Sequence, residues 1–585
     1  MSRFFDGFEG LLVDMDGVLY DSMKGHTLAW KMMMDELCVR TERDEFYLYE
    51  GMTGKETINL IFERVYGRKA TAEEAETLYH RKTEIFRSFA EPSPMSGASR
   101  MLAAFERAGL RRVLVTGSAQ GSLLKSLDRD YPGVFPADRR VTALDVKHGK
   151  PAPEPYLKGA SIAGADPGRC IVVENAPLGV RAGKSAGCFT VAVMTGPIPR
   201  EEFEREGADM IFSSMDEFAD WVEATSLRRG VEVTEAESPA AVLNDMAKRL
   251  EADKYLVVTD ENVGRLWLPS LDEFTKRDDV EVATVAAGEA CKSLAEVATL
   301  WKKLSDEGYT RRSVVINFGG GSVTDMGGFA ASTFKRGVRY VNLATTLLAM
   351  ADAAVGGKTG IDFGGKKNEV GAFRNPERVI VSGKFIETLR QEELMSGMGE
   401  IVKTAMLESE EFYSELPDVY EAICTKRSGY GRLAGKMAAR AAAFKERVVN
   451  ADPKEQGYRK ILNLGHTAGH ALESLAMRSG ETLSHGECVA HGLYTALLIS
   501  ESIAGLEKGM AEDYRRTILS KYYRPLPFRK EEIGTLIEIM GVDKKNRKAG
   551  EPEFVLLRAP GRPVWGIRPG KEIIAAALEK TLSKG

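Results

Sequence analysis

Short apolar runs, each followed by a polar or glycine-rich turn and a segment with helical periodicity, recur along most of this chain. Residues 11–13, 112–115 and 170–173 have this form in the first part, and residues 255–260 and 313–318 repeat it later. Alternating buried strands and helices are typical of a parallel sheet covered by helices. Further along, helical periodicity dominates. The sequence therefore predicts a multidomain α/β protein whose last third is mostly helical.

Breaks in this pattern divide the chain, which at 585 residues is too long for one hydrophobic core. A first α/β unit is expected over residues 1–225. Residues 226–240 contain a Ser-Pro pair among charged residues and are expected to form an exposed linker. A nucleotide-binding α/β domain is then expected over residues 241–384, and a helical domain that binds metal and substrate over residues 385–585.

Composition limits the environment and the partners of the protein. A net charge of -5 argues against nucleic acid or an anionic membrane as a partner. No apolar run reaches the roughly 18 residues that a membrane-spanning helix needs, and the N-terminus lacks the layout of a signal peptide. The six cysteines form no C-x-x-C pair, which fits a reducing compartment. We therefore expect a cytoplasmic protein that acts on small molecules.

Polar residues that carry chemistry follow the strands predicted in the first unit, or lie in a turn between them. These residues are Asp14, Asp16, Thr116, Lys150, Glu174 and Asn175. In an open α/β sheet, ligands bind at the C-terminal ends of the strands. The carboxylates of Asp14 and Asp16, at i and i+2, can share one Mg²⁺ and act as nucleophile and proton donor. The alternative for this pair is a structural cap at a strand–helix turn.

Four motifs of this unit, DMDGVLYDS, VTGS, HGKPAPEPY and VVENAPLGVRAGKSAG, resemble the haloacid dehalogenase superfamily in its helical-cap subgroup. The resemblance implies that Asp14 forms an aspartyl-phosphate, while Asp16 protonates the leaving oxygen and activates water. Thr116 and Lys150 would hold the phosphoryl group. The implied Mg²⁺ ligands are Asp14, Asp16, Glu174 and Asn175, the last standing where many members carry a second acid.

The same resemblance implies a helical cap over about residues 20–90. His26, Thr53 and Lys55 are candidates to contact the substrate from this cap. Related motifs serve both phosphatases and phosphosugar mutases. We expect a phosphatase of a small phosphorylated metabolite, with the mutase as the alternative.

A second set of motifs lies between residues 313 and 368, where three strand–turn segments are rich in glycine. A strand, a glycine turn and a helix allow backbone N–H groups to approach a pyrophosphate. Any one of these glycines is equally explained by a tight turn. A nucleotide and a phosphorylated substrate would each use the N–H groups and lysines of this stretch.

The histidines are clustered in the helical part. Of the seven histidines, four lie within residues 466–491, and none lies between residues 149 and 465. One acid and two or three histidines are typical Zn²⁺ ligands that leave one position open, and Glu400 is the candidate acid. By spacing alone, His466 and His470 could both bind the metal, and any one of these histidines could instead be a packed interface residue. His485 is the third candidate.

From about Tyr255 to the C-terminus the chain resembles 3-dehydroquinate synthase, of the sugar-phosphate cyclase superfamily. The resemblance rests on GGGSVTDMGGFAAS, the EIVK motif, GHTAGH and the SHGE turn. It implies that Glu400, His466 and His485 hold Zn²⁺ or Co²⁺, that His470 faces the substrate phosphate, and that the protein is a homodimer with catalytic NAD.

Further roles follow from the same resemblance, position by position. The implied catalytic residues are Lys358, Lys403, Lys445, Arg459, Asn463 and His470, and the implied substrate-binding residues are Arg336, Asp352, Asn368 and Lys544. The implied NAD-contacting residues are Asp260, Asn262, Glu289, Lys292, Gly320, Gly321, Asp325, Thr345, Thr346 and Lys367. Two departures from the common pattern, Met326-Gly327-Gly328 and Arg374, touch none of these residues.

The reaction implied is the conversion of 3-deoxy-D-arabino-heptulosonate 7-phosphate to 3-dehydroquinate and phosphate, a step of the shikimate pathway. NAD would be recycled without net redox change. The alternatives are another sugar-phosphate cyclase, such as one for sedoheptulose 7-phosphate, and an NAD- and Zn-dependent polyol dehydrogenase. The dehydrogenase predicts net accumulation of NADH, whereas a cyclase shows none.

Overall fold

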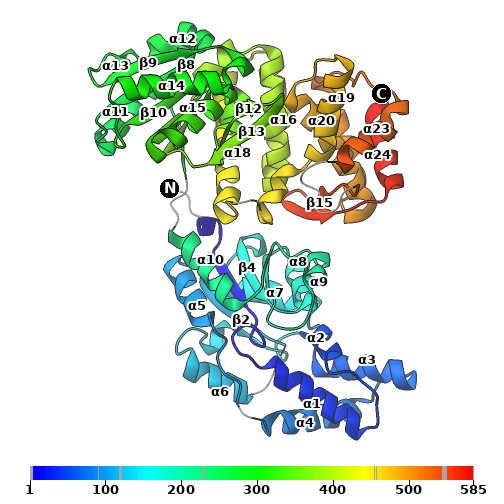
Figure 1. Ribbon diagram of the computed structural model, residues 1–585. Coiled ribbons are helices and arrows are strands. Elements are labelled where there is room, and N and C mark those ends of the chain that lie inside the picture. Colours follow the sequence, from blue (N-terminus) through cyan, green and yellow to red (C-terminus); the bar gives the residue numbers. More distant parts are fainter. Residues whose placement is uncertain are drawn as a thin grey trace. The chain divides into compact units, whose positions relative to one another are not determined.

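The computed structural model describes residues 4–89, 91–117, 121–227, 231–453, 455, 457–542 and 550–583. The chain divides into two compact units, Arg3–Arg228 and Arg229–Gly585, with the first two residues assigned to the latter (Figure 1). None of the helices in the described part of the chain is both long and apolar enough to cross a membrane. The predicted multidomain α/β class is confirmed.

The described residues of the first unit form a parallel sheet of six strands. These are β1 (Gly10–Val13), β2 (Arg111–Val115), β3 (Arg140–Val141), β4 (Cys170–Glu174), β5 (Phe189–Val193) and β6 (Met210–Phe212), ordered β3-β2-β1-β4-β5-β6. β1 is buried throughout and lies between β2 and β4, as expected for a strand with helices on both faces. The ends of β1, β2 and β4 therefore place Asp14, Thr116 and Glu174 at one edge of the sheet.

Helices surround this sheet and form a separate segment after β1. The helices that follow the cap segment are α5 (Ala98–Arg107), α6 (Gly121–Asp130), α7 (Glu154–Ala163), α8 (Pro177–Ala186), α9 (Arg200–Arg205) and α10 (Met215–Leu227). The cap segment contains α1 (Met23–Glu36), α2 (Glu45–Leu48), α3 (Gly54–Tyr66) and α4 (Ala72–Arg87). Thr53 and Thr71 begin α3 and α4 with capping boxes, in which each side chain accepts a backbone N–H three residues later.

The second unit begins with another parallel sheet, described over six strands. These are β7 (Glu232–Glu235), β8 (Tyr255–Asp260), β9 (Val280–Val285), β10 (Val314–Gly319), β11 (Arg339–Ala344) and β14 (Arg378–Val381), ordered β7-β14-β11-β10-β8-β9. The accompanying helices include α11 (Pro239–Leu250), α12 (Glu261–Trp267), α13 (Asp272–Thr275), α14 (Leu294–Asp306) and α15 (Gly321–Thr333). A hairpin of β12 (Lys358–Phe363) and β13 (Lys366–Phe373) leaves the sheet region before β14.

The rest of the unit is mainly helical. Its helices include α16 (Gln391–Glu408), α17 (Glu410–Cys424), α18 (Tyr430–Ala451), α19 (His466–Ser479), α20 (His485–Ile499), α21 (Met510–Tyr514), α22 (Ser520–Tyr522), α23 (Ile533–Gly541) and α24 (Lys571–Leu582). A hairpin of β15 (Phe554–Ala559) and β16 (Arg562–Ile567) precedes α24. α16 and α20 touch backbone to backbone, because a Cβ on Gly486 would lie 1.8 Å from the carbonyl oxygen of Ser396.

The prediction that residues 226–240 form an exposed linker is wrong for most of these residues. α10 continues to Leu227, β7 pairs in parallel with β14, and α11 begins at Pro239. The charged sequence of β7 conceals a strand because it lies at the edge of the sheet, where Glu232 forms an ion pair with Arg378. The sheet that was expected from residue 241 thus includes residues before the predicted boundary.

Replacing Gly486 by Ala should destabilise the second unit by roughly 1–3 kcal/mol, because the added methyl group meets backbone atoms that cannot rotate away. Chemical denaturation followed by circular dichroism measures the change. Gly534→Ala in α23 is the matched control, since no heavy atom lies within 4 Å of its Cβ position, and it should be neutral or slightly stabilising. Equal stability of the Gly486→Ala variant and the original protein would contradict the close helix contact.

Candidate active sites

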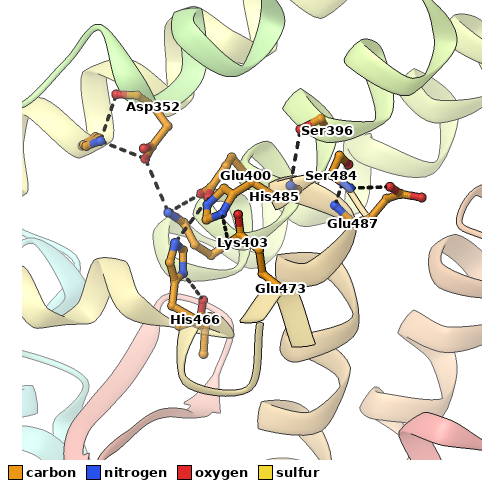
Figure 2. Close-up of polar contacts among 12 residues, drawn as sticks. Asp352, Ser396, Glu400, Lys403, His466, Glu473, Ser484, His485 and Glu487 are labelled. Carbon is orange, nitrogen blue, oxygen red and sulfur yellow. Dashed lines mark hydrogen bonds and ion pairs between the residues drawn. The ribbon is translucent and has the colours of Figure 1, made fainter. Parts of the chain in front are cut away.

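Three potential metal ligands converge in the second unit. Glu400 comes from the middle of α16, and His466 and His485 are the first residues of α19 and α20. Glu400 Oε1 lies 3.3 Å from His466 Nε2 and 3.1 Å from His485 Nε2 (Figure 2). One ligand atom from each residue falls within 4.8 Å of the others. The structure thus brings together the three residues that the family resemblance implies.

The geometry of these atoms fits a divalent metal. Protein ligands bind Zn²⁺ at about 2.0–2.1 Å in a tetrahedron, whose edges are then roughly 3.3 Å long. The oxygen–nitrogen separations of 3.1 and 3.3 Å match such edges. A carboxylate and two imidazoles leave a fourth position for another ligand. His470, one turn after His466 on α19, is outside the group of three ligand atoms, although its ring lies 5.1 Å from the ring of His466.

Burial and charge set the protonation of the ligands. Burial lowers the pKa of His466 to about 4, which leaves its ring neutral and able to bind a metal. Burial alone would lower the pKa of His485, but hydrogen bonds to Glu400 and Glu473 raise it to about 10. Burial would raise the pKa of Glu400, yet Lys403 and the two histidines hold it well below its usual range. In the absence of a metal, a proton on His485 therefore adds positive charge to that of Lys403.

A second network joins the metal ligands to predicted catalytic lysines. Lys403 Nζ lies 2.5 Å from Glu400 Oε2 and 3.6 Å from Asp352 Oδ1. Lys445 Nζ, from α18, lies 2.9 Å from Asp352 Oδ1 and donates to the backbone oxygen of Asp352 at 2.9 Å. Burial lowers the pKa of Lys445 although Asp352 opposes the shift. Asp352 is thus the shared partner of both lysines.

A third group of predicted residues lies around Gly356 and Glu455. Arg459 is 2% exposed and donates to the Gly356 carbonyl at 3.0 Å. Gly356 has φ +101°, and a Cβ there would lie 3.1 Å from Arg459 Nη2 and 3.3 Å from Lys445 Cε. Lys358 forms an ion pair with Glu455, and Asn463 donates to Glu455 Oε1 at 3.0 Å. Glu455 was not predicted, because nothing in its local sequence distinguishes it from the other acidic residues of the chain.

Predicted nucleotide-binding residues form a network at the ends of β8, β9 and β10. Asp260 caps α12 by accepting from the backbone of Asn262 and Val263. Lys292 Nζ lies 3.0 Å from Asp325 Oδ2 and 3.6 Å from Glu289 Oε1, and it also donates to Asn368 Oδ1.

The glycine-rich turn before α15 packs against the two threonines that follow β11. Gly320 and Gly321 lead into α15, and the backbone N–H of Thr345 donates to Gly319 at 2.9 Å. A Cβ on Gly320 would lie 3.0 Å from the side chain of Thr346. The Thr345 hydroxyl is buried and has no hydrogen-bond partner among the described residues. An unsatisfied buried hydroxyl at this turn fits a ligand atom placed there.

Three predicted positions lie apart from these networks or outside the described residues. Arg336 is exposed and has a left-handed backbone, with φ +66°. Lys367 points its ammonium group toward Glu473, at 3.7 Å from Oε1. Lys544 lies outside the described residues.

In the first unit, a buried lysine joins two predicted carboxylates. Lys150 Nζ lies 2.5 Å from Asp14 Oδ1 and 2.6 Å from Glu174 Oε1, and it donates to the backbone oxygen of Val115 at 3.1 Å. Thr116 is buried at the end of β2. Burial raises the pKa of Asp14 to about 8, although Lys150 opposes the shift. This arrangement matches the expected phosphoryl site.

Asp16 has different neighbours and the opposite pKa shift. It accepts from Ser22 Oγ at 2.6 Å and lies 3.2 Å from His26 Nε2, while Lys82 Nζ lies 2.6 Å from His26 Nδ1. Although burial raises the pKa of Asp16, His26 and Ser22 lower it overall. His26 thus contacts Asp16, and its contact with a substrate stays a prediction. Lys82 was missed because it lies 56 residues after His26 in the chain.

The predicted Mg²⁺ ligands leave an oxygen available. Asn175 Oδ1 is buried and has no hydrogen-bond partner among the described residues, as expected of an atom that binds a cation. Asn175 Nδ2 donates at 3.0 Å to both carboxylate oxygens of Glu50, a residue of the cap segment. Burial and Asp14 raise the pKa of Glu50 well above its usual value. The sequence alone did not reveal Glu50, because one acid in a polar turn carries no spacing signal.

Of the other two cap candidates, Thr53 uses its hydroxyl in the capping box of α3, and Lys55 is exposed. A cavity between the cap segment and the sheet is lined by both predicted aspartates. Its other polar side chains include those of His26, Glu50 and Lys82.

Comparisons with known proteins assign a family to each of the two units. Residues 8–187 match the family of haloacid dehalogenase-like hydrolases. Residues 282–396 match the N-terminal part of 3-dehydroquinate synthase, and residues 397–546 match its C-terminal part. These matches define a chain that joins a haloacid dehalogenase-like hydrolase domain to a cyclase of the dehydroquinate synthase type.

A curated relative shows a family to which the chain belongs. The 3-dehydroquinate synthase of Parabacteroides distasonis is 39% identical over 54% of this chain and 88% of its own length. The chain belongs to the 3-dehydroquinate synthase family.

Solved structures also match each part of the chain. A structure of 2-epi-5-epi-valiolone synthase from Streptomyces hygroscopicus, with NAD+ and Zn2+ bound, is 24% identical and covers 60% of this chain and 97% of that chain, with a TM-score of 0.51. A putative β-phosphoglucomutase from Bacteroides vulgatus is 39% identical and covers 39% of this chain and 98% of that chain, with a TM-score of 0.37. The first of these supports the fold predicted for the second unit.

Zinc binding to the second unit should release about one proton at pH 8. His485 has a pKa of about 10 without metal and must lose its proton to bind, whereas His466 is already neutral. Calorimetric titration in buffers of different ionisation enthalpy measures this release. An Asp14→Asn background removes the proton that Asp14 of the first unit would release at this pH, and His485→Asn is the control that should lose the release. Binding without proton release at pH 8 would contradict the charged His485.

Proposed function

We propose that the second unit converts 3-deoxy-D-arabino-heptulosonate 7-phosphate to 3-dehydroquinate and phosphate, a step of the shikimate pathway. The proposal rests on the charged residues that surround the cluster of Glu400, His466 and His485. Lys403 contacts both Glu400 and Asp352, and Lys445 also contacts Asp352. Because Lys403 and Lys445 share the carboxylate of Asp352, an anionic group of a substrate can also interact with them. The identity to dehydroquinate synthases over most of their length supports this substrate over that of a sister cyclase.

The cofactors of this unit are NAD and a divalent metal, Zn²⁺ or Co²⁺. When bound, NAD supplies reversible hydride transfer, and the metal acidifies hydroxyl groups of the substrate. Glu400, His466 and His485 would hold the metal. The nucleotide would lie along the turn before α15, near Lys292 and Thr345.

The remaining residues bind and orient the substrate. Arg459 and Lys445 meet at Gly356 and provide positive charge for a phosphate or a carboxylate. Lys403 is fixed between Glu400 and Asp352, so its ammonium group is oriented before the substrate arrives. Burial of this group keeps water from competing for the same donors. The homodimer implied by the family resemblance stays a prediction.

We also propose that the first unit is a Mg²⁺-dependent phosphatase of a small phosphorylated metabolite. Asp14 attacks the phosphorus atom while Asp16 gives its proton to the leaving oxygen. Water then attacks the aspartyl-phosphate, gives its proton back to Asp16, and releases phosphate and the free Asp14 carboxylate. The different surroundings of the two carboxylates support two different roles, since Asp14 lies beside Lys150 and Asp16 beside Ser22 and His26. Glu174 and Asn175 would complete the metal site.

Lys445→Ala and His466→Ala should each lower cyclase activity at least tenfold, because one removes a buried cation and the other a metal ligand. Release of phosphate and formation of dehydroquinate are measured with the heptulosonate phosphate and substoichiometric NAD. Lys436→Ala, an exposed lysine on the same helix, is the control and should keep full activity. Activity on sedoheptulose 7-phosphate alone would favour a sister cyclase, and accumulation of NADH would favour a dehydrogenase.

Asp14→Asn should reduce Mg²⁺-dependent hydrolysis of a generic aryl phosphate by roughly a thousandfold or more, since it removes the nucleophile. Cyclase activity of the same variant should stay unchanged, because Asp14 belongs to the other unit. Asp138→Asn, an exposed aspartate of the first unit, is the matched control. An Asp14→Asn variant that remains an active phosphatase would refute the assignment of the nucleophile.

A further inference from the structure

The carboxylate of Glu473 contacts the metal cluster from outside. Glu473 lies on α19, three residues after His470 and seven after His466, so these side chains share one face of the helix. Its Oε2 lies 3.2 Å from His485 Nδ1 (Figure 2). The other ring nitrogen, Nε2, lies 3.1 Å from Glu400 Oε1. The imidazole of His485 is therefore held between two carboxylates, one on each nitrogen.

We propose that Glu473 is a positioning residue of the metal site, which fixes the ring of His485 so that Nε2 faces the metal. This inference rests on the metal site proposed above and adds a residue to it. The Nδ1–H group of His485 donates a hydrogen bond to Glu473. The lone pair of Nε2 is then directed toward the other two metal ligands, Glu400 and His466. A carboxylate in this place also makes the ring a stronger base.

The second carboxylate oxygen of Glu473 also lies near a charged side chain. Oε1 lies 3.7 Å from Lys367 Nζ, a lysine of the β12–β13 hairpin. The carboxylate is thus held by His485 on one side and by a cation on the other, and its side chain is only 19% exposed. Rotation of the carboxylate would lose one of these partners.

The two histidine ligands differ in how they are oriented. His466 Nδ1 lies 3.2 Å from the backbone oxygen of Leu464, two residues earlier, so the chain itself orients this ring. His485 begins α20 and receives its partner from another helix, α19. The orientation of His485 therefore depends on a side chain that a single substitution can remove, whereas that of His466 does not.

Titration of the full-length protein with Co²⁺ tests the proposal. A site with two imidazoles gives a strong visible absorption when it is tetrahedral, whereas an all-oxygen octahedral site such as that of the first unit absorbs weakly. Glu473→Ala should weaken Co²⁺ binding about 10- to 100-fold and change the shape of the visible band. Glu473→Gln keeps a neutral acceptor for Nδ1–H and should lose less affinity than Glu473→Ala.

The control is Glu481→Gln, an exposed glutamate just after α19, which should keep the affinity of the original protein within about twofold. Unchanged affinity and band shape in both Glu473 variants would overturn the positioning role while leaving the metal site intact. Equal losses of Co²⁺ affinity in the Gln and Ala variants would show that Glu473 does not act as a hydrogen-bond acceptor for His485. That result would also overturn the positioning role. If the original protein gives no tetrahedral band, or His466→Ala keeps it, the proposed metal site itself fails.

Discussion

Burial of a single carboxylate constrains the second unit. The Glu400 side chain is fully buried, and an isolated carboxylate in that environment would be very costly. It stays ionised because Lys403, His466 and His485 surround it at 2.5 to 3.3 Å. These groups come from three helices, so the relative placement of α16, α19 and α20 is set by one charge. The glycine contact between α16 and α20 permits that placement, since any side chain there would hold the helices apart.

The first unit meets the same constraint with a different balance of charge. Asp14, Glu174 and Glu50 gather around Lys150 and Asn175, so negative groups outnumber positive ones. Burial raises the pKa of both Asp14 and Glu50 as a result. A divalent cation would reverse this shift, because its charge favours the ionised carboxylates. The second unit instead carries enough lysine and histidine to balance its acids, and a metal bound there would replace a proton on His485.

The sequence predicted those features that follow from local pattern or from motifs. Apolar runs located the strands, and motifs such as DMDG and GHTAGH located residues that the fold brings together. Spacing alone left His470 and His485 as rival partners for His466; the family resemblance favoured His485, and the structure groups His485 with Glu400 and His466. Glu50, Lys82, Glu455 and Glu473 were missed, because each acts through a contact between segments far apart in the chain. The edge strand β7 was also missed, since its acidic end residues are typical of a linker and its ion pair with Arg378 depends on a distant strand.

The β12–β13 hairpin joins the two halves of the cyclase site. Lys367 and Asn368 are adjacent in β13, where the left-handed backbone of Asn368 interrupts the regular strand. Lys367 faces Glu473 beside the metal cluster, whereas Asn368 contacts Lys292 in the nucleotide network. Asn368 holds a left-handed backbone, with φ +51°, at a cost that the Lys292 contact and the bond from its own N–H to Asp362 help to offset. A shift of this strand would therefore change the surroundings both of Lys292, which is predicted to bind the nucleotide, and of the Glu473 carboxylate that contacts His485.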